Sequence, residues 1–391
     1  MRTDRRESIA LLISSFRAGG GERVMIDVAN QLARTGHGVD LLVLKPVGQY
    51  ESQVDTRVRV VSLDARRIIL SLPKLMKYMT HERPSTLLAL DEYTHLLALI
   101  AKRVTGVPVR VVLRVGNMYS ELFARYEGVS AYVLPFLIRR LYKHADAMIA
   151  VSKGVKDEVV RITGIDEARV AVIYNPKPLD EIRTKAQEDI DHPWFTDRSG
   201  PVIVSVGRLR VQKNFPVLIQ AFAKLPPDAP ARLMIVGAGR EEGRLRTLIE
   251  KLGLTEKVAL VGYVDNPYRF MAHAIVVVSA SLWEGMPNGI LEAMASGAAI
   301  VASDCDSGPR EILAPDSDYR TRLTTGVEYA AHGVLVAVND EEALAQALER
   351  MLTDTDLRTA YRKQSMARIQ DFNQDTLLPE YERVLKAIVS V

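Results

Sequence analysis

SLWEGMPNGILEAMASG, residues 281–297, is the stretch of sequence that decides the fold of this chain. It follows an apolar run at 275–278 that predicts a buried parallel strand, and it continues into 291–295, whose residues favour a helix. Between strand and helix, Gly285 and Gly289 let the backbone approach a ligand closely. Because a helix N-terminus presents free backbone N–H groups, this strand, loop and helix predict an anion site of the kind that binds phosphate.

Two carboxylates lie on either side of the predicted anion site. Glu284 stands in the loop, and Glu292 stands eight positions later in the first turns of the helix. Carboxylates are strong acceptors for hydroxyl groups, so the pair indicates a ligand that combines phosphate with sugar hydroxyls. On spacing alone, two solvated carboxylates explain the pattern equally well.

Three further motifs stand in order along the chain: GGGER at 19–23, VGRL at 206–209 followed by Lys213 and Asn214, and GAG at 237–239. Together with EGMPNGILEAMASG they resemble the signature of the retaining, two-domain nucleotide-sugar glycosyltransferases of family four, which have the GT-B fold. The resemblance covers nearly the whole chain. It implies an α/β protein with two Rossmann-like, doubly wound domains that face each other across a cleft.

The length of 391 residues also favours two domains, and alternating strands and helices imply parallel sheets. Residues 1–176 are expected to form an N-terminal, acceptor-binding domain whose last strand lies within 144–152. The polar stretch 177–200 is expected to be the interdomain linker. Residues 201–374 would form the nucleotide-sugar-binding domain, and a C-terminal helix at 375–391 would cross back to the first domain.

The net charge of +3 is unevenly distributed. Residues 1–175 carry 26 Lys and Arg against 18 Asp and Glu, which gives +8 and leaves −5 for the remainder. A basic half can face nucleic acid, an anionic membrane or a phosphorylated substrate. The single cysteine, Cys305, excludes an intramolecular disulfide and indicates a reducing compartment. With no apolar leader after the charged residues 1–6 and no apolar run near ~18 residues, we expect a cytoplasmic protein.

Two segments combine apolar and basic residues, at 66–78 and 132–143. Such segments suit a helix that lies on an anionic bilayer, and the alternative for each is a core-packed helix with a solvated basic face. Their position in the basic half favours peripheral contact with the inner face of the cell membrane. A lipid-linked acceptor would require that contact, and no nucleic-acid partner is expected.

Two cations follow the predicted strand 202–206. Arg208 and Lys213 could neutralise a diphosphate, Arg208 by binding two oxygens and Lys213 as a point charge. In the family these residues hold the leaving diphosphate, and with Glu284 they are the expected catalytic residues. The resemblance further implies that Glu292 binds the ribose hydroxyls, Glu284 the sugar hydroxyls and the backbone near Val264 the nucleobase. The expected donor-binding residues are Gly20, Gly21, Gly207, Val264, Gly285, Met286, Asn288, Gly289, Ile290 and Glu292.

Acceptor or sugar contacts are expected in the first domain. Asp91 and His95 follow the predicted strand 85–90, at the end where doubly wound sheets bind ligands. The lone His95 is also typical of a structural histidine. After the strand 109–113, Arg114 and Asn117 stand near the position where many relatives carry a histidine that contacts the transferred sugar.

The predicted activity is retaining transfer of a hexose or N-acetylhexosamine from a nucleotide-diphosphate sugar, with a UDP-sugar the commoner donor in the family. The acceptor is expected to be a lipid-linked glycan in polysaccharide, lipopolysaccharide or glycoprotein-glycan assembly. No Asp-x-Asp motif stands at the donor site, so no metal cofactor is expected. The alternatives are transfer to a soluble acceptor, a nucleotide-sugar 2-epimerase, and a binding scaffold without turnover.

Overall fold

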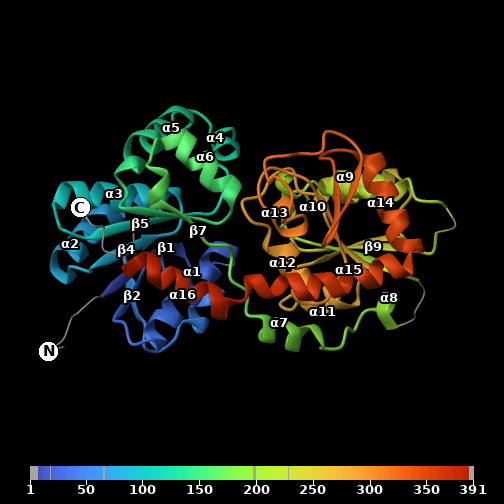
Figure 1. The fold of residues 1–391 in the computed structure, drawn as a ribbon, viewed down its shortest axis with the longest axis horizontal. Helices are drawn as coiled ribbons and strands as arrows, with labels where there is room; N and C mark the ends of the chain where they lie inside the picture. The colour runs from blue at the N-terminus through green and yellow to red at the C-terminus, as the bar shows by residue number, and fades with distance from the viewer. Residues whose placement is uncertain (1–7, 18, 65–66, 197–199, 228, 387–391) are drawn as a thin grey trace. The chain divides into compact units, whose positions relative to one another are not determined.

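The chain divides into two compact units, Met1–Pro176 with Asp375–Val391 and Lys177–Gln374 (Figure 1). In this computed structural model the described residues are 8–17, 19–64, 67–196, 200–227 and 229–386. Each unit contains one sheet with helices on both of its faces. The expected fold of two Rossmann-like, doubly wound α/β domains is confirmed.

The first unit has a seven-stranded sheet in which all strands are parallel, in the order β3-β2-β1-β4-β5-β6-β7. The strands are β1 (Ile9–Ser15), β2 (Val39–Lys45), β3 (Arg59–Ser62), β4 (Thr86–Ala89), β5 (Arg110–Val115), β6 (Ala147–Ala150) and β7 (Val170–Val172). Ile9 pairs with Val39 on one side and with Thr86 on the other. The strand order therefore reverses between β1 and β4, and their carboxyl ends mark the switch point where such sheets bind ligands.

Helices cover both faces of this sheet, α2, α3 and α6 on one side and α1 and α16 on the other (Figure 1). The helices are α1 (Gly20–Arg34), α2 (Leu72–Glu82), α3 (Glu92–Thr105), α4 (Tyr119–Phe123), α5 (Ser130–Leu141), α6 (Lys153–Thr163) and α16 (Gln374–Lys386), with 3₁₀ turns η1 (Gln49–Gln53), η2 (Ile68–Ser71), η3 (Tyr142–His144) and η4 (Glu167–Arg169). Thr86 Oγ1 donates to the Leu385 carbonyl at 3.0 Å, so α16 packs on this unit. Residues 387–391 of the predicted C-terminal helix lie outside the described residues.

The second sheet has the order β10-β9-β8-β11-β12-β14-β13 and is parallel apart from the antiparallel pair β13 and β14. Its strands are β8 (Val202–Val206), β9 (Arg232–Val236), β10 (Val258–Gly262), β11 (Val276–Ser279), β12 (Ile300–Ser303), β13 (Val327–Ala330) and β14 (Gly333–Val336). Here the order reverses between β8 and β11. The loops after these two strands carry the VGRL and EGMPNG motifs, which therefore meet at a switch point.

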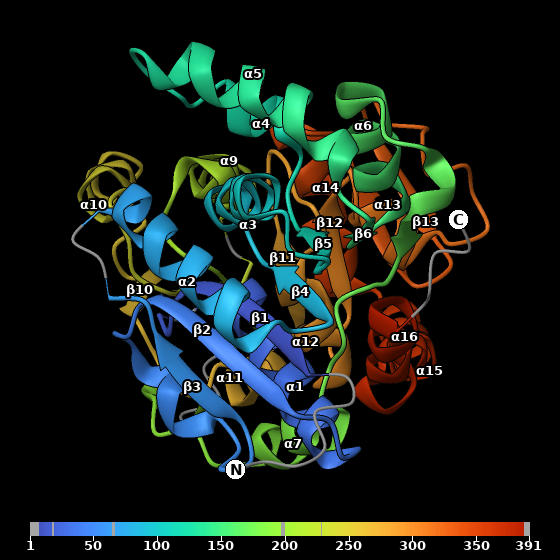
Figure 2. The ribbon, with the colours of Figure 1, turned by 90° about the vertical axis from the view of Figure 1, so that its left-hand side faces the viewer.

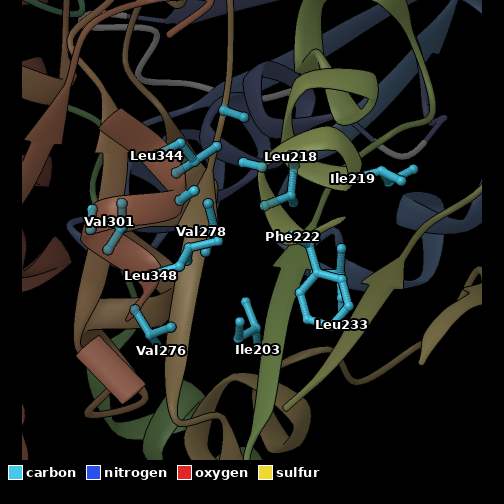
Figure 3. Packing of buried hydrophobic residues seen from close by; sticks show 14 of the residues in the cluster. Ile203, Leu218, Ile219, Phe222, Leu233, Val276, Val278, Val301, Leu344 and Leu348 are labelled. Atoms are coloured by element: carbon cyan, nitrogen blue, oxygen red, sulfur yellow. The ribbon is translucent and has the colours of Figure 1, made fainter. Parts of the chain in front are cut away.

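The core of the second unit lies between this sheet and its helices. The helices are α7 (Leu179–Ala186), α8 (Pro193–Thr196), α9 (Phe215–Ala223), α10 (Glu242–Lys251), α11 (Tyr268–His273), α12 (Asn288–Ala295), α13 (Pro309–Leu313), α14 (Glu341–Thr353) and α15 (Thr355–Arg368), with turns η5 (Val211–Lys213) and η6 (Ile369–Phe372). Leu218 and Phe222 of α9 and Leu344 and Leu348 of α14 pack over the strands from one face (Figure 3). These side chains are almost fully removed from water, and apolar burial of this kind is the main stabilising term of a doubly wound unit.

Three sequence-based boundaries differ from the structure. The stretch 177–200 is not a free linker, because it contains α7 and α8, and Leu179 and Ile182 are buried within the second unit. The strand within 144–152 is not the last of its unit, since β7 pairs with β6 beyond it. Strand β5 continues through Arg114 to Val115 instead of ending at residue 113.

Candidate active site

The loop after β8 is fixed in place by the loop after β9. The backbone N–H of Gly207 donates to the Val236 carbonyl, and that of Leu209 donates to the Ala238 carbonyl, both at 3.0 Å. Gly237 has φ 145°, and a Cβ there would lie 2.0 Å from the Gly207 carbonyl oxygen. The GAG motif therefore has a packing role, since any side chain at Gly237 would displace the loop that carries the two predicted cations.

Lys213 and Glu284 meet at the switch point of the second sheet. Lys213 Nζ lies 2.5 Å from Glu284 Oε1, and Ser281 Oγ donates to the same oxygen at 2.8 Å. Glu284 is 7% exposed, whereas Arg208 of the same group is exposed on its loop. The structure thus brings two of the three expected catalytic residues into direct contact, and Ser281 joins them, a residue that sequence reasoning did not single out.

The loop at 284–288 is supported by the segment that follows β12. Ser307 Oγ donates to the Gly285 carbonyl at 2.8 Å. Gly308 has φ 93°, and a Cβ there would lie 2.4 Å from Pro287 Cδ. The loop that carries Glu284 is therefore held against the segment that follows β12.

Helix α12 begins at Asn288 and directs its N-terminal backbone amides toward the same end of the sheet. A small, partly open pocket adjoins that turn. It is lined in part by Val206, Lys213, Ser279, Pro287, Gly289 and Ile290. Met286 and Ile290 have buried side chains, so a ligand would meet them through their backbone.

Glu292 lies in α12, where Lys177 Nζ approaches its Oε1 at 3.0 Å. Sequence reasoning missed Lys177, because the residue fell in the stretch expected to be a linker. Val264 follows β10, whose carboxyl end lies at the same edge of the sheet as Gly207. These positions are compatible with the expected contacts of Glu292 with the ribose and of the Val264 backbone with the nucleobase.

In the first unit, Gly20 and Gly21 form the start of α1 at the carboxyl end of β1. The residue before the helix is also a glycine, so no side chain caps the N-terminal amides. A Cβ on Gly21 would lie 3.0 Å from Leu90 Cδ1, so a larger residue here would require the Leu90 side chain to move. Asp91 lies opposite, at the end of β4, where its carboxylate accepts from Ser14 Oγ at 2.5 Å.

His95 is a structural residue and does not line a site. The imidazole is 1% exposed, with Nδ1 2.9 Å from the Tyr142 hydroxyl and Nε2 3.1 Å from the Ala89 carbonyl oxygen. Burial lowers the pKa of the His95 imidazole to about 4, so the ring is neutral at physiological pH. With both ring nitrogens bonded within the core, it has no atom left for a sugar.

Arg114 is likewise held within the first unit. Its side chain is 2% exposed, Nε donates to the Tyr381 hydroxyl at 3.1 Å, and Nη2 donates to Asn175 Oδ1 at 2.6 Å. The bond to Tyr381 ties β5 to α16, and the bond to Asn175 ties β5 to the segment after β7, so Arg114 is a structural anchor in contrast to the predicted sugar contact. Asn117 is exposed on the loop after β5 and remains accessible.

Glu92, next to Asp91, also follows the strand predicted at 85–90, but it was not among the predicted acceptor contacts. Burial first, and the charge of Asp91 next, raise the pKa of the Glu92 carboxyl to about 7. A carboxyl group with such a pKa at the switch point of a ligand-binding sheet is typical of a functional site. The signal available in the sequence was its position directly after a strand and beside another carboxylate.

Two doubly wound units, one with a cation–carboxylate pair and a helix N-terminus at its switch point, define the GT-B class of sugar-nucleotide-binding proteins. Models of two families match the chain: Glycosyl transferases group 1 over residues 186–368 and Glycosyltransferase Family 4 over residues 18–181.

Comparisons with individual proteins agree. The "N-acetylgalactosamine-N,N'-diacetylbacillosaminyl-diphospho-undecaprenol 4-alpha-N-acetylgalactosaminyltransferase" of Campylobacter jejuni is 31% identical over 94% of this chain and 96% of its own. The lipopolysaccharide core biosynthesis glycosyltransferase LpsE of Rhizobium meliloti is 25% identical over 93% of this chain and 92% of its own. Anabaena HepE, solved with UDP and glucose, shares the fold with a TM-score of 0.78 at 20% identity, covering 98% of this chain and 100% of HepE. The chain belongs to the group 1, family 4 glycosyltransferases.

Proposed function

We propose that the protein is a retaining glycosyltransferase that transfers a hexose or N-acetylhexosamine from a UDP-sugar to a lipid-linked glycan at the cytosolic face of the membrane. The observation that carries the proposal is the contact of Lys213 with Glu284 beside the N-terminus of α12. In this site, cations and backbone amides are placed to bind an anion, and the carboxylate of Glu284 is placed to accept hydrogen bonds from sugar hydroxyls.

The chemistry follows from the direction in which charge moves. When the bond from the sugar to the diphosphate breaks, negative charge builds on the leaving phosphate. Arg208, Lys213 and the amides of 285–290 would stabilise that charge without reorganisation. The acceptor oxygen would attack from the same face, and the leaving phosphate would take its proton, which retains the anomeric configuration. Glu292 would hold the ribose.

The choice of UDP and of a lipid-linked acceptor is supported by the relatives. Anabaena HepE was solved with UDP and with UDP-glucose. The Campylobacter jejuni relative is named for an acceptor linked to diphospho-undecaprenol, and LpsE is named for the lipopolysaccharide core. Among the described residues, no helix is long and apolar enough to cross a membrane.

Helix α5 is the better supported of the two basic segments for that contact. Val129, directly before the helix, and Tyr132, Val133 and Phe136 within it, called here the α5 patch, are 78%, 81%, 44% and 64% exposed. Their spacing places them on one helical face. Figure 2 shows α5 at the margin of the first unit, beside α4. Helix α5 packs against α3, α4 and α6.

Basic side chains adjoin the α5 patch. Arg139 and Arg140, at the C-terminal end of α5, and Lys143, in the following turn η3, are exposed and form a basic cluster along the chain. Burial, followed by the charges of Lys143, Arg103 and Arg140, lowers the pKa of His144. Apolar side chains beside such a cluster suit an anionic bilayer.

For the segment 66–78, the burial pattern favours a core-packed helix with a solvated basic face over a helix that lies on a membrane. Leu75 and Tyr78 are buried, while Lys74 and Lys77 face solvent. Its exposed apolar residues are Ile69 and Leu70 in the turn η2. Arg66 lies outside the described residues.

The direct test is turnover. Purified protein is incubated with UDP-N-acetylgalactosamine, UDP-N-acetylglucosamine, UDP-galactose and UDP-glucose, each with an undecaprenyl-diphosphate-linked amino sugar as acceptor. We expect one donor to give a glycosylated lipid whose new linkage has the donor's anomeric configuration by NMR. Activity should persist in a chelator, and inactivation there would refute the metal-free mechanism. Donor conversion with the acceptor left out would instead identify an epimerase.

Membrane contact is tested by flotation with vesicles that contain phosphatidylglycerol. Wild-type protein should float, and raised salt should release it because exposed charges are screened. Phe136→Glu should abolish flotation, whereas Leu252→Glu, at an exposed apolar position of the second unit, should not. Equal flotation of both variants would refute the role of α5.

A further inference from the structure

Lys177 is an unusually constrained cation. Its side chain is 8% exposed, and its ammonium lies 3.0 Å from Glu292 Oε1. It stands between Pro176 and Pro178, and a residue that precedes a proline is restricted to extended conformations. Such restriction reduces the backbone entropy lost when this segment is held in one conformation.

The backbone of Lys177 is fixed as well. Its N–H donates to the Phe372 carbonyl at 2.8 Å, and its carbonyl accepts from the Gln374 N–H at 2.9 Å. These bonds form an isolated parallel bridge between Lys177 and Asn373. The ammonium therefore projects from a rigid base toward α12, where Glu292 is the acidic partner.

A carboxylate offers about four acceptor positions on its two oxygens. The ammonium of Lys177 uses one on Oε1, and the remaining positions suffice for the two vicinal hydroxyls of a ribose. Glu292 is 24% exposed, so without this bond its side chain could turn to several rotamers. The bond selects one of them before the donor arrives.

We propose that Lys177 is a positioning residue for donor recognition, which orients the Glu292 carboxylate to accept the hydroxyls of the donor ribose. The inference rests on the proposed function, which assigns the ribose to Glu292. Lys177 does not itself touch the nucleotide in this scheme. Its removal should weaken recognition of the ribose hydroxyls and leave contacts with base and diphosphate in place.

The test compares UDP with 2′,3′-dideoxyuridine diphosphate, which lacks both hydroxyls, by titration calorimetry. Wild-type protein should prefer UDP. Lys177→Met should reduce that preference by about tenfold, a size typical of coupling between adjacent side chains, and should leave the affinity for the dideoxy compound unchanged. In a Glu292→Gln background, Lys177→Met should have no further effect on the preference.

The matched control is Lys185→Met, which removes an exposed lysine of α7 paired with Glu181 and should leave the preference at the wild-type value. If Lys177→Met does not fold, Lys177→Gln takes its place, because glutamine keeps part of the aliphatic chain and an amide that can donate to Glu292. The preference for UDP over the dideoxy compound should then fall by less than it would in Lys177→Met.

The outcomes separate the two proposals. If the Lys177 variants bind UDP and the dideoxy compound more weakly by the same factor, Lys177 has only a structural role. If they bind UDP more tightly, Lys177 competes with the ribose for Glu292. Either result overturns this inference and leaves the proposed function in place. Failure of wild-type protein to bind either nucleotide would overturn the proposed UDP-sugar donor as well.

Discussion

Arg310 holds the segment that packs against the loop at 284–288, and its side chain is 3% exposed. Nη2 lies 2.6 Å from Asp304 Oδ2, and Nε lies 3.1 Å from Oδ1. The Asp304 side chain is fully buried, and Nη2 also lies 2.8 Å from Glu328 Oε2. Substitution of Arg310 by methionine keeps much of the volume but leaves a buried carboxylate without its cation.

Breaking a buried pair by removal of one partner costs about 3 kcal/mol or more of unfolding free energy, because the remaining charge stays desolvated. For a unit of this size, 3 kcal/mol lowers Tm by roughly 6 to 12 °C. Both tryptophans of the chain, Trp194 and Trp283, belong to the second unit. Intrinsic tryptophan fluorescence during thermal unfolding therefore reports on the unit that contains Arg310.

The matched control is Arg246→Met, which breaks a surface pair with Glu242 whose side chains are 56% and 39% exposed. Exposed pairs contribute about 0 to 1 kcal/mol, so this variant should melt close to wild type. In the double variant Arg310→Met with Asp304→Asn, the charge is removed as well, and part of the lost stability should return. The reasoning is refuted if Arg310→Met lowers the free energy of unfolding by no more than Arg246→Met does. It is also refuted if the losses of unfolding free energy caused by Arg310→Met and Asp304→Asn simply add in the double variant.

Three further predictions concern the two switch points. Lys213→Gln should lower kcat by roughly a hundredfold, the usual effect of removing one group that stabilises developing charge, whereas Lys224→Gln, at an exposed pair, should keep wild-type turnover. Because the pKa of Glu92 is raised on folding from 4.5 to about 7, the folded state binds that proton more tightly, so stability should fall as pH rises between those values. Thermal melts across this range should be flatter for Glu92→Gln, and identical pH profiles would contradict the assignment. Gly237→Ala should cost about 1 to 3 kcal/mol of stability, measured by thermal melts, because its positive φ and the neighbouring carbonyl oxygen exclude a side chain. Gly243→Ala, in α10 with no atom near its Cβ position, should be neutral or stabilising.

Most strands of the fold could be predicted from the sequence. The predicted strand 202–206 coincides with β8, and β11 is shifted by one residue from its predicted range of 275–278. Strands of a doubly wound sheet are buried on both faces, so they appear as continuous apolar runs, and the glycines after them mark the loops. The loops that carry the VGRL and EGMPNG motifs could be located for the same reason.

Contacts that depend on tertiary packing could not be predicted in the same way. His95 was chosen as a candidate because it follows a strand, yet the strand order and the buried Tyr142 beside it are not visible in sequence. The helix α7 could not be predicted because it has only eight residues, and these are mostly polar apart from Leu179 and Ile182. The contact of Lys177 with Glu292 joins residues 115 positions apart, and the spacing of motifs gives no distance between them.

The position of the single cysteine has a practical consequence. Cys305 is 1% exposed, and burial raises the pKa of its thiol well above the usual value, so little thiolate is available for reaction. Maleimide dyes should leave the native chain almost unlabelled. A cysteine introduced at Tyr132, which is 81% exposed, would then be the fast-reacting thiol, and an environment-sensitive fluorophore there could follow the arrival of α5 at a vesicle surface in real time.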